Sequence, residues 1–338
     1  MIVNFFLDNR IGGPHNYSTE LQKLLKRQFL NVTSGKSKFC KTYIINLRNF
    51  WKYFFIIEIL INIFEILFMF NKNRFKYFYV FSIFNFAPII SGILLRKKIK
   101  WFIVEEPKFF TKFFYKILNL LGNFETVVIS KFIANILKVK KYKIVYPYID
   151  TKFWKNIPSF NYKKNYLKLL CVGNLNKTKN HLNLLKYLQN INISYEISII
   201  GEILKTQKNY IKKIQEIKKN INKNTSNKVI ILGRLNKHKI KNLLKKTDLY
   251  ILPSLTEGLP LSLMEAMSMS NLCLISSNSN KSKLVKNNKN GFIFQLSKNS
   301  FEKSIIKIIN LNKSKKINIK NEARKTIINV NLKNKIND

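Results

Sequence analysis

Two carboxylates, Glu257 and Glu265, are spaced eight residues apart on either side of a turn. The segment 252–267 reads LPSLTEGLPLSLMEAM, in which the end of an apolar strand leads into a Gly-Leu-Pro turn and a helix that begins near Pro260. The first amides of a helix lack intrahelical partners and attract anions. Glu265 lies roughly 7.5 Å along the helix from Pro260, so both carboxylates can flank one ligand whose anionic part lies at the helix start. A sugar nucleotide has this chemistry.

This segment resembles the E-x7-E region of retaining glycosyltransferases with the GT-B fold, in particular glycosyltransferase family 4, the glycosyl transferases group 1. Eight residues match the pattern S-x-x-E-G-x-P-x-x-L-x-E-A-M: Ser254, Glu257, Gly258, Pro260, Leu263, Glu265, Ala266 and Met267. A chance match of common helix residues is the alternative. The resemblance implies that Glu257 hydrogen-bonds the hydroxyls of a donor sugar and that Glu265 accepts hydrogen bonds from the ribose of its nucleotide.

The resemblance also implies which groups hold the donor diphosphate. The segment 170–181, LCVGNLNKTKNH, is similar to the family element G-R-L-x-x-x-K, whose two basic residues bind phosphate. Lys179 takes the lysine position, but Asn174 takes the arginine position and can donate a hydrogen bond without bringing charge. In a chain this rich in lysine, a solvated surface residue is the alternative for Lys179. Backbone amides of the turn are expected beside the lysine, those of Gly258, Leu259 and Leu261.

A glycine pair near the N-terminus is similar to the glycine loop of the family. Gly12 and Gly13 lie in the segment DNRIGGPHNY, directly after the first apolar run. The resemblance implies that they let the backbone approach the donor phosphates and the acceptor, and a plain Gly-Gly-Pro turn is the alternative. Gly233 and Arg234 resemble the family loop that cradles the nucleotide base.

Two adjacent acids follow the strand pattern at residues 100–105. Relatives often have a histidine there that faces the reacting sugar, whereas this chain has Glu105 and Glu106 before Pro107. Neighbouring side chains on an extended segment point in opposite directions, so one glutamate can orient the acceptor hydroxyl. The alternative is that both are helix N-terminal charges.

Length and periodicity predict two α/β domains. A chain of 338 residues exceeds one typical core, and alternating apolar runs and helix-period stretches indicate two parallel, doubly wound sheets. The resemblance implies the GT-B arrangement of two Rossmann-like domains with an interdomain cleft. We expect an acceptor-side domain at 1–150, a nucleotide-sugar-binding domain at 151–320, and a tail or helix at 321–338, with packing back on the first domain as one option. The expected strands are 2–7, 42–47, 77–83, 101–105, 126–129, 144–146, 167–172, 197–200, 229–232, 249–252 and 272–275.

The net charge of +44 has two interpretations. Lysine is spread through the chain with asparagine and isoleucine, as codon usage in an AT-rich genome would give without a binding role. The functional alternative is attraction to an anionic membrane surface, at about 1 kcal/mol for each nearby Lys or Arg. No nucleic-acid partner is expected, because the sequence contains no recognisable motif for one.

The apolar segment 50–70 is long enough to span a bilayer. However, Glu58, Asn62 and Glu65 share one helical face, and each glutamate near the membrane centre would cost about 2.5 to 3.5 kcal/mol. A transmembrane span is therefore disfavoured. We expect a helix buried in the first domain, with a helix in the membrane interface as the alternative.

Neither a metal nor another cofactor is expected beyond the nucleotide sugar itself as co-substrate. The three cysteines lack metal-type spacing and no Asp-x-Asp pair occurs. Lysine and helix amides would instead stabilise the leaving group. The first residues do not resemble a signal peptide, so the expected location is cytoplasmic, with peripheral attachment to the inner face of the membrane as an option.

These features together favour a retaining glycosyltransferase of the hexosyltransferase type. It would move a sugar from a nucleotide-diphosphate donor to a saccharide or lipid-linked acceptor, in the synthesis of cell-surface polysaccharide, lipopolysaccharide or another glycan. Glu257, Glu105 and Glu106 are the candidate catalytic residues. The alternatives are a sugar-nucleotide isomerase of the 2-epimerase type on the same fold and a non-catalytic, membrane-associated sugar-nucleotide binding protein.

Overall fold

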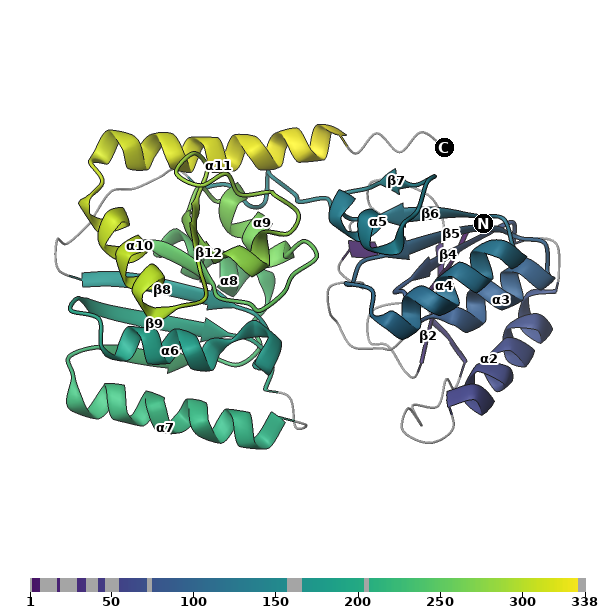
Figure 1. Ribbon diagram of the computed structural model, residues 1–338, viewed down its shortest axis with the longest axis horizontal. Helices are drawn as coiled ribbons and strands as arrows, with labels where there is room; N and C mark the ends of the chain where they lie inside the picture. The colour runs from purple at the N-terminus through teal and green to yellow at the C-terminus, as the bar shows by residue number, and fades with distance from the viewer. Residues whose placement is uncertain are drawn as a thin grey trace. The chain divides into compact units, whose positions relative to one another are not determined.

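The structure is a computed structural model (Figure 1), and it describes these residues: 2–6, 17–18, 29–34, 42–45, 55–71, 75–156, 166–203 and 207–333. The chain divides into two compact units, the first built from residues 1–148 and the second from residues 149–335. Each unit contains one parallel sheet with helices, which confirms the predicted α/β class.

The first unit has a seven-stranded sheet in the order β3-β2-β1-β4-β5-β6-β7, and every neighbouring pair is parallel. Its strands are β1 (Ile2–Phe5), β2 (Phe29–Ser34), β3 (Thr42–Ile45), β4 (Tyr77–Phe81), β5 (Lys98–Ile103), β6 (Phe124–Val128) and β7 (Lys143–Ile144). Its labelled helices are α2 (Phe55–Phe70), α3 (Phe86–Leu94), α4 (Phe109–Leu121) and α5 (Lys131–Leu137). The strand order reverses between β1 and β4.

The second unit repeats this plan with six parallel strands in the order β10-β9-β8-β11-β12-β13. Its strands are β8 (Tyr166–Val172), β9 (Ser194–Ile200), β10 (Lys228–Ile231), β11 (Leu249–Leu252), β12 (Leu272–Ser276) and β13 (Phe292–Phe294). Its helices are α6 (His181–Gln189), α7 (Lys208–Asn224), α8 (Lys237–Lys245), α9 (Leu261–Ser268), α10 (Lys298–Asn310) and α11 (Lys313–Lys333). Here the strand order reverses between β8 and β11.

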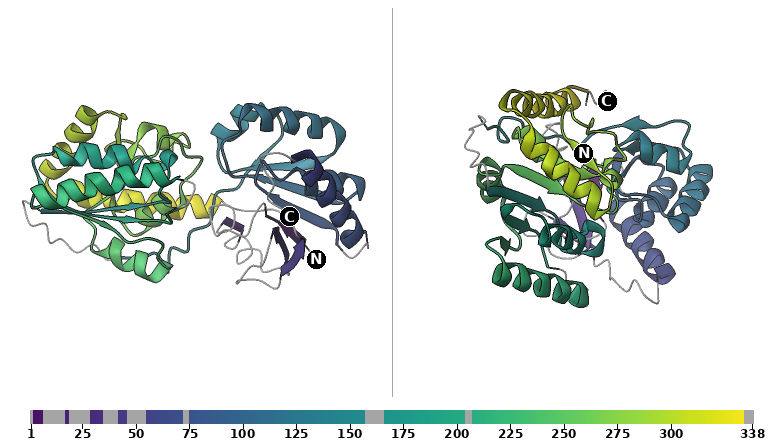
Figure 2. Two further views of the ribbon diagram at one scale, coloured as in Figure 1. Left: turned by 90° about the horizontal axis from the view of Figure 1, so that it is seen from below. Right: turned by 60° about the vertical axis from the view of Figure 1, so that its left-hand side comes forward.

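Burial on both faces explains the strand sequences of the second unit. β11 and β12 read LYIL and LCLIS, and every residue of both strands is buried. A parallel sheet covered by helices on both sides selects such apolar runs. Figure 2 shows helices on both faces of this sheet, with α6 beside α7 and α9 beside α11.

All eleven predicted strands overlap observed strands. The periodicity does not predict the short β13, and it gives no sign of β2. Its sequence, FLNVTS, has a polar residue, Asn31, near the middle. The Asn4 amide on the adjacent β1 donates a hydrogen bond to Asn31 Oδ1 at 3.0 Å, and both side chains are buried. A buried amide is tolerated where its hydrogen bonds are made. The partner comes from a distant part of the sequence, which a local pattern does not reveal.

The segment 50–70 contains α2, and the expectation that this helix is buried is wrong for one of its faces. Asn62, Ile66 and Phe70 are buried against the rest of the unit. The opposite face exposes five apolar side chains, those of Ile57, Leu60, Ile61, Phe64 and Phe68. The buried polar residue therefore points inward, and the apolar face points to solvent. Among the helices within the ranges given above, none combines the length and hydropathy needed to cross a bilayer.

The helix α11 runs across the domain boundary expected at residue 320. The segment 321–338, expected as a tail or helix after the second domain, is part of this helix up to Lys333, and α11 packs on α9 and β12 of the second unit. Arg324 on this helix donates hydrogen bonds to three carbonyl oxygens, those of Thr151, Trp154 and Ser268. Two of these acceptors belong to the first residues of the second unit, so α11 fixes the start of that unit to its end.

Backbone hydrogen bonds join the loops that leave β8, β9 and β10. The Gly173 amide donates to Ile200 O at 2.8 Å, and the Gly201 amide donates to Gly233 O at 2.9 Å. This approach leaves no room for a side chain at residue 201, because a Cβ there would lie 1.9 Å from Gly173 O. Glycine is therefore required at residue 201 by the packing of two loops.

Replacing Gly201 by alanine is expected to lower the free energy of unfolding by at least about 3 kcal/mol, because the opposing backbone carbonyl cannot move without disturbing the sheet. Gly173→Ala is the matched control, since its Cβ would meet only the flexible side chain of Lys179, at 3.2 Å. Urea denaturation followed by circular dichroism measures both variants. Equal unfolding free energies for the two would contradict this packing argument.

The first residue of α6, His181, has a buried imidazole. Burial, and to a smaller degree the nearby Lys179 ammonium, lowers the pKa of His181 from 6.5 to about 4. As the pH falls, the unfolded chain therefore binds this proton before the folded protein does. The stability that depends on the neutral imidazole is complete above pH 6.5 and is lost progressively as the pH falls toward 4.

On acidification from about pH 7 to about pH 4.5, the free energy of unfolding is expected to fall by about 2 kcal/mol through His181. His181→Gln cannot be protonated in this range, so its unfolding free energy should depend less steeply on pH than that of the wild type. Urea denaturation at a series of pH values measures both slopes. Identical slopes would show that other groups account for the acid sensitivity.

Candidate active site

Lys179 and Glu257 form an ion pair where the strand order of the second sheet reverses. Lys179 ends the 3-10 turn after β8 (Lys177–Lys179), and Glu257 lies in the loop after β11. These strands are neighbours, and Lys179 Nζ lies 2.6 Å from Glu257 Oε1. Ligands of open parallel α/β sheets bind at the carboxyl ends of the strands at such a reversal. The structure thus brings together two charged residues that were predicted from separate motifs.

Asparagines on either side of the lysine hold the pair in place. Asn176 accepts a hydrogen bond from the Lys179 backbone amide at 3.0 Å. Asn180 has a left-handed backbone (φ 58°), and its side-chain amide donates to Pro253 O at 3.1 Å. The side chains of Lys179 and Glu257 are 26% and 11% exposed, so the pair is shielded from bulk water but open to a ligand.

The turn after Glu257 leads into α9, which begins one residue later than the sequence predicts. Pro260 has an extended backbone (φ −76°, ψ 116°) and precedes the first helical residue, Leu261. No side chain caps this helix start, and Ser262 Oγ donates to Val172 O at 3.1 Å, which ties α9 to the end of β8. The amides at the start of α9 are therefore positioned to hold an anion near the ion pair.

The other residues of this motif lie on the turn and on α9. Gly258 is half-buried, and Leu259 packs its side chain into the core. Glu265 is half-buried and lies four residues after Leu261, on the same side of the helix. Among the described glycines, Gly233 has a left-handed backbone (φ 66°).

Three further predicted residues lie at the carboxyl edge of the β10-β9-β8 half of the sheet. The Asn174 side-chain oxygen accepts a hydrogen bond from the Glu202 backbone amide at 3.2 Å. This bond fixes the loop after β8 to the loop after β9. Because the Asn174 side-chain oxygen is used in this bond, the side-chain NH2 group is the part of Asn174 that can donate to a ligand. Gly233 O accepts from Gly201, and the exposed Arg234 follows it. Asn174 thus has a structural contact that the family pattern does not imply.

In the first unit, Glu105 supports the loop that follows β4. Its Oε2 accepts a hydrogen bond from the Ile83 amide at 3.3 Å, and it also bonds the Ser82 side chain. Burial raises the pKa of the Glu105 carboxyl, and these hydrogen bonds oppose that rise. Glu106 is half-buried and precedes α4, which begins at Phe109. The predicted glycines Gly12 and Gly13 lie outside the described residues.

Several residues of the site escaped the sequence analysis because their partners are distant in sequence. Tyr250 OH donates to Ser262 Oγ at 2.8 Å, and burial raises the pKa of Tyr250 well above its usual range. Ser276 and Ser279 both bond the carbonyl of Ser254, at 2.6 and 3.2 Å. A polar residue at the carboxyl end of a buried strand is the signal that could have identified Ser276.

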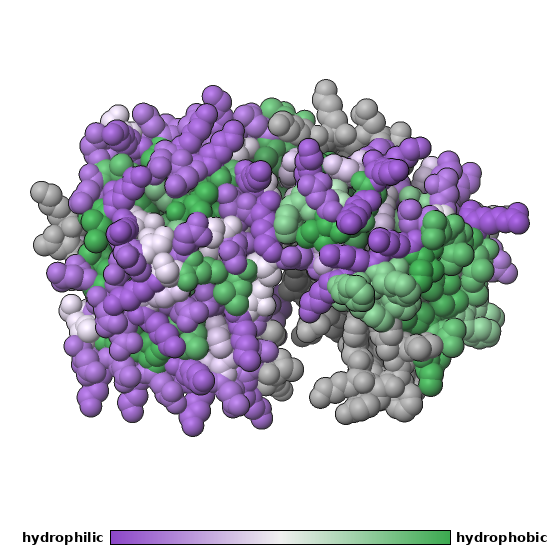
Figure 3. All heavy atoms as spheres, in the orientation of Figure 1, coloured by the Kyte–Doolittle hydropathy of each residue, from purple (hydrophilic) through white to green (hydrophobic). Residues whose placement is uncertain are grey.

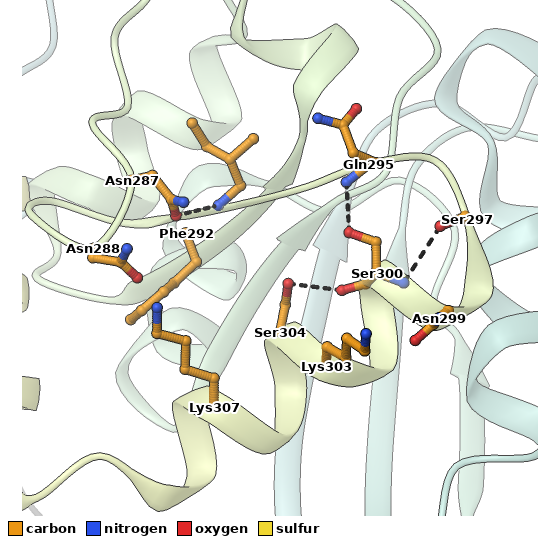
Figure 4. A pocket seen from close by; sticks show the side chains of 11 residues that line it. Asn287, Asn288, Phe292, Gln295, Ser297, Asn299, Ser300, Lys303, Ser304 and Lys307 are labelled. Atoms are coloured by element: carbon orange, nitrogen blue, oxygen red, sulfur yellow. Dashed lines mark hydrogen bonds between the residues drawn. The ribbon is translucent and has the colours of Figure 1, made fainter.

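A pocket of about 380 Å³ lies elsewhere in the second unit, between β13 and α10 (Figure 4). Asparagine, serine and lysine side chains line much of its wall, among them Asn287, Ser300 and Lys307. None of the predicted donor-binding residues lines this pocket. Over the described part of the chain, no group of three His, Cys, Asp or Glu side chains is arranged to hold a metal ion.

Solved structures of glycosyltransferases share the fold of this chain and confirm the predicted GT-B class. A structure of Anabaena Alr3699/HepE in complex with UDP and glucose has a TM-score of 0.81 at 14% identity, over 98% of this chain and 97% of that chain. A glycosyltransferase from Rickettsia africae has a TM-score of 0.78 at 18% identity, over 97% of this chain and 93% of that chain.

A curated relative matches a shorter stretch. The UDP-Gal:alpha-D-GlcNAc-diphosphoundecaprenol alpha-1,3-galactosyltransferase of Escherichia coli is 35% identical over 107 residues. The match spans 31% of this chain and 27% of the relative. The family model of glycosyl transferases group 1 matches residues 152–326, which contain the ion pair, its loops and α9. Since that model covers just over half of the sequence, the chain belongs to the glycosyl transferases group 1 family.

Proposed function

We propose that this protein is a retaining glycosyltransferase that moves a hexose-type sugar from a nucleotide-diphosphate donor to a hydroxyl of a saccharide or lipid-linked acceptor. The observation that supports this best is the 2.6 Å pair of Lys179 and Glu257 beside the start of α9. It offers a cation and helix amides to a diphosphate, and a carboxylate to sugar hydroxyls. The proposed product is a cell-surface polysaccharide, lipopolysaccharide or another glycan.

In the proposed reaction, the bond between the anomeric carbon and the diphosphate oxygen breaks, and the acceptor oxygen bonds to that carbon on the same face. The proton of the acceptor hydroxyl passes to the departing diphosphate. Negative charge develops on the departing diphosphate, where Lys179 and the first amides of α9 stabilise it. One such positioned group changes kcat by about 100-fold to 1,000-fold. Glu257 accepts hydrogen bonds from the hydroxyls of the donor sugar and orients that sugar. Glu265 accepts hydrogen bonds from the ribose hydroxyls of the nucleotide.

Contacts in the first unit bear on the acceptor side of the reaction. Glu105 and Glu106 remain our candidates for orienting the acceptor hydroxyl. Glu105 also holds the loop after β4 in position, because its carboxylate makes hydrogen bonds to Ile83 and Ser82 of that loop. We propose that Gly12 and Gly13 let the backbone approach the donor phosphates and the acceptor.

The donor is proposed to be a UDP-hexose. The Escherichia coli relative is named for UDP-Gal, and the Anabaena structure contains UDP and glucose. In this chain the base would lie near Gly233 and Arg234 at the end of β10, with Asn174 donating a hydrogen bond to the diphosphate.

A lipid-linked acceptor is proposed because the same relative is named for a diphosphoundecaprenol substrate. Such an acceptor is anchored in a membrane. We therefore propose that the protein works in the cytoplasm as a peripheral protein on the inner face of the cell membrane.

Lys179→Met is expected to lower the rate of transfer by about 100-fold or more, because the departing diphosphate loses its cation. Glu257→Gln should lower it as well, since a carboxylate that accepts from sugar hydroxyls becomes a neutral amide. The purified variants are assayed with a panel of UDP-hexoses, and free nucleotide and the anomeric configuration of the product are measured. Transfer that survives Glu257→Ala unchanged would remove this residue from the site.

The pair Lys298 and Glu302 offers matched controls, because it lies on the surface of α10 with an N···O distance of 3.7 Å. Lys298→Met and Glu302→Gln should leave transfer unchanged. The same panel distinguishes the alternatives: a transferase yields hydrolysed donor or product, a sugar-nucleotide isomerase yields epimerised donor, and a non-catalytic binding protein yields neither. Either of the last two outcomes would overturn the proposed reaction.

Transfer is also expected to need no divalent metal. Lys179 and the helix amides supply the positive charge, and the sequence contains no Asp-x-Asp pair. Activity in excess EDTA should therefore stay within about twofold of the activity with added Mg²⁺ or Mn²⁺. A loss in EDTA that added metal restores would contradict this mechanism of charge stabilisation.

A further inference from the structure

The first unit has an extended apolar surface on the outer faces of α2 and α4, which Figure 3 shows as a continuous green patch. We call it the α2–α4 surface and define it by its most exposed members: Phe64, Phe68, Leu94, Phe109, Leu120 and Leu121. Phe68, Phe109 and Leu120 are 84%, 88% and 86% exposed. Apolar patches of this kind mark sites of protein or membrane interaction.

The surface is continuous because α3 lies between the two other helices and contacts both (Figure 1). Phe114 of α4 packs on Phe86 of α3 with ring centroids 5.2 Å apart, and Leu94 is exposed at the end of α3. Both outer helices also place polar residues inward, since Asn62 of α2 and Thr111 of α4 are buried. This is the reverse of a helix that faces water.

Basic residues border the apolar surface. Lys108, Lys112 and Lys116 recur every four residues along α4, beside the face that includes Phe109. Arg96, Lys97 and Lys98 follow the exposed Leu94 at the end of α3. The segments 86–104 and 107–124 contain no Asp or Glu, so the border along α3 and α4 is positive, whereas α2 contributes Glu58 and Glu65 and no basic residue.

We infer that the α2–α4 surface docks on an anionic lipid bilayer. Its phenylalanines and leucines would enter the boundary of headgroups and acyl chains, and its lysines and arginine would meet the anionic headgroups. A second copy of the chain fits less well, because a symmetric contact would bring two borders of the same sign together. The inference goes beyond the proposed location by assigning the surface and the lipid charge, and it does not depend on the transfer reaction.

Sedimentation with vesicles, in the absence of nucleotide sugar, tests this inference. Wild-type protein is expected to bind vesicles of phosphatidylcholine and phosphatidylglycerol, and to bind pure phosphatidylcholine far less. The triple variant Phe68→Gln, Phe109→Gln, Leu120→Gln should lose affinity at least about tenfold. Since all three positions are exposed, it should keep the unfolding transition of the wild type. Lys112→Glu with Lys116→Glu should lower affinity for anionic vesicles at least roughly 30-fold.

The second unit offers matched controls. Lys213→Glu with Lys219→Glu changes two exposed lysines of α7, and Leu332→Gln changes an exposed leucine of α11. These variants should bind vesicles within about twofold of the wild type, because their side chains lie outside the docking surface. An equal loss in the controls would mean that total charge drives binding, and would overturn the inference. Failure of the wild type to bind anionic vesicles would overturn it too, and sedimentation equilibrium would then show whether the surface joins two copies.

Discussion

The parallel pairing of β8 with β11 is the constraint on which the candidate site depends. Leu169 and Leu170 lie opposite Leu249 and Tyr250, so both strands end at the same edge of the sheet. A backbone hydrogen bond of 2.8 Å from Leu255 to the carbonyl of Thr178 then joins the two loops beyond the strands. Lys179 and Glu257 are 78 residues apart in the chain, and this pairing makes them neighbours. Any other strand order would separate the cation from the carboxylate by the width of a strand or more.

Electrostatics explains why these two side chains pair with each other. The chain has 61 basic residues and 17 acidic ones, so there are too few carboxylates to give each lysine and arginine a partner of its own. A lysine shielded from water needs a partner, because desolvating an unpaired ammonium is costly. Glu257 supplies that partner and keeps the ammonium ordered at the start of α9. In the proposed reaction, a diphosphate that enters this position would find the cation already in place, which reduces the reorganisation needed on binding.

Phenylalanine side chains occupy two kinds of position in the first unit, the buried core and the exposed apolar surface. Phe81 and Phe102 stack in the core with ring centroids 4.6 Å apart, and both are buried. Phe68 and Phe109 have the same chemistry but face outward on α2 and α4. Composition cannot distinguish the two groups. The difference comes from which side of each helix packs against the sheet and α3, and that choice leaves one apolar side of α2 and α4 exposed.

Much of the fold and part of the site follow from the sequence alone. The apolar runs predict eleven of the observed strands, and the Gly-Leu-Pro turn predicts the start of α9 within one residue. Local periodicity and turn chemistry encode such elements because they depend on neighbouring residues. Two separate motifs also identify Lys179 and Glu257 as charged candidates after the ends of two strands.

Tertiary structure decided which candidates meet and which faces are buried. β2 was missed because its buried Asn31 accepts a hydrogen bond from Asn4 of another strand. The sequence also did not predict three other features: the exposed apolar face of α2, the hydrogen bond of Asn174 to the loop after β9, and the hydrogen bonds of Glu105 to the loop after β4. In each case the deciding partner is distant in sequence. A pattern of residue types records what a side chain can do, whereas the packing of the sheet determines what it touches.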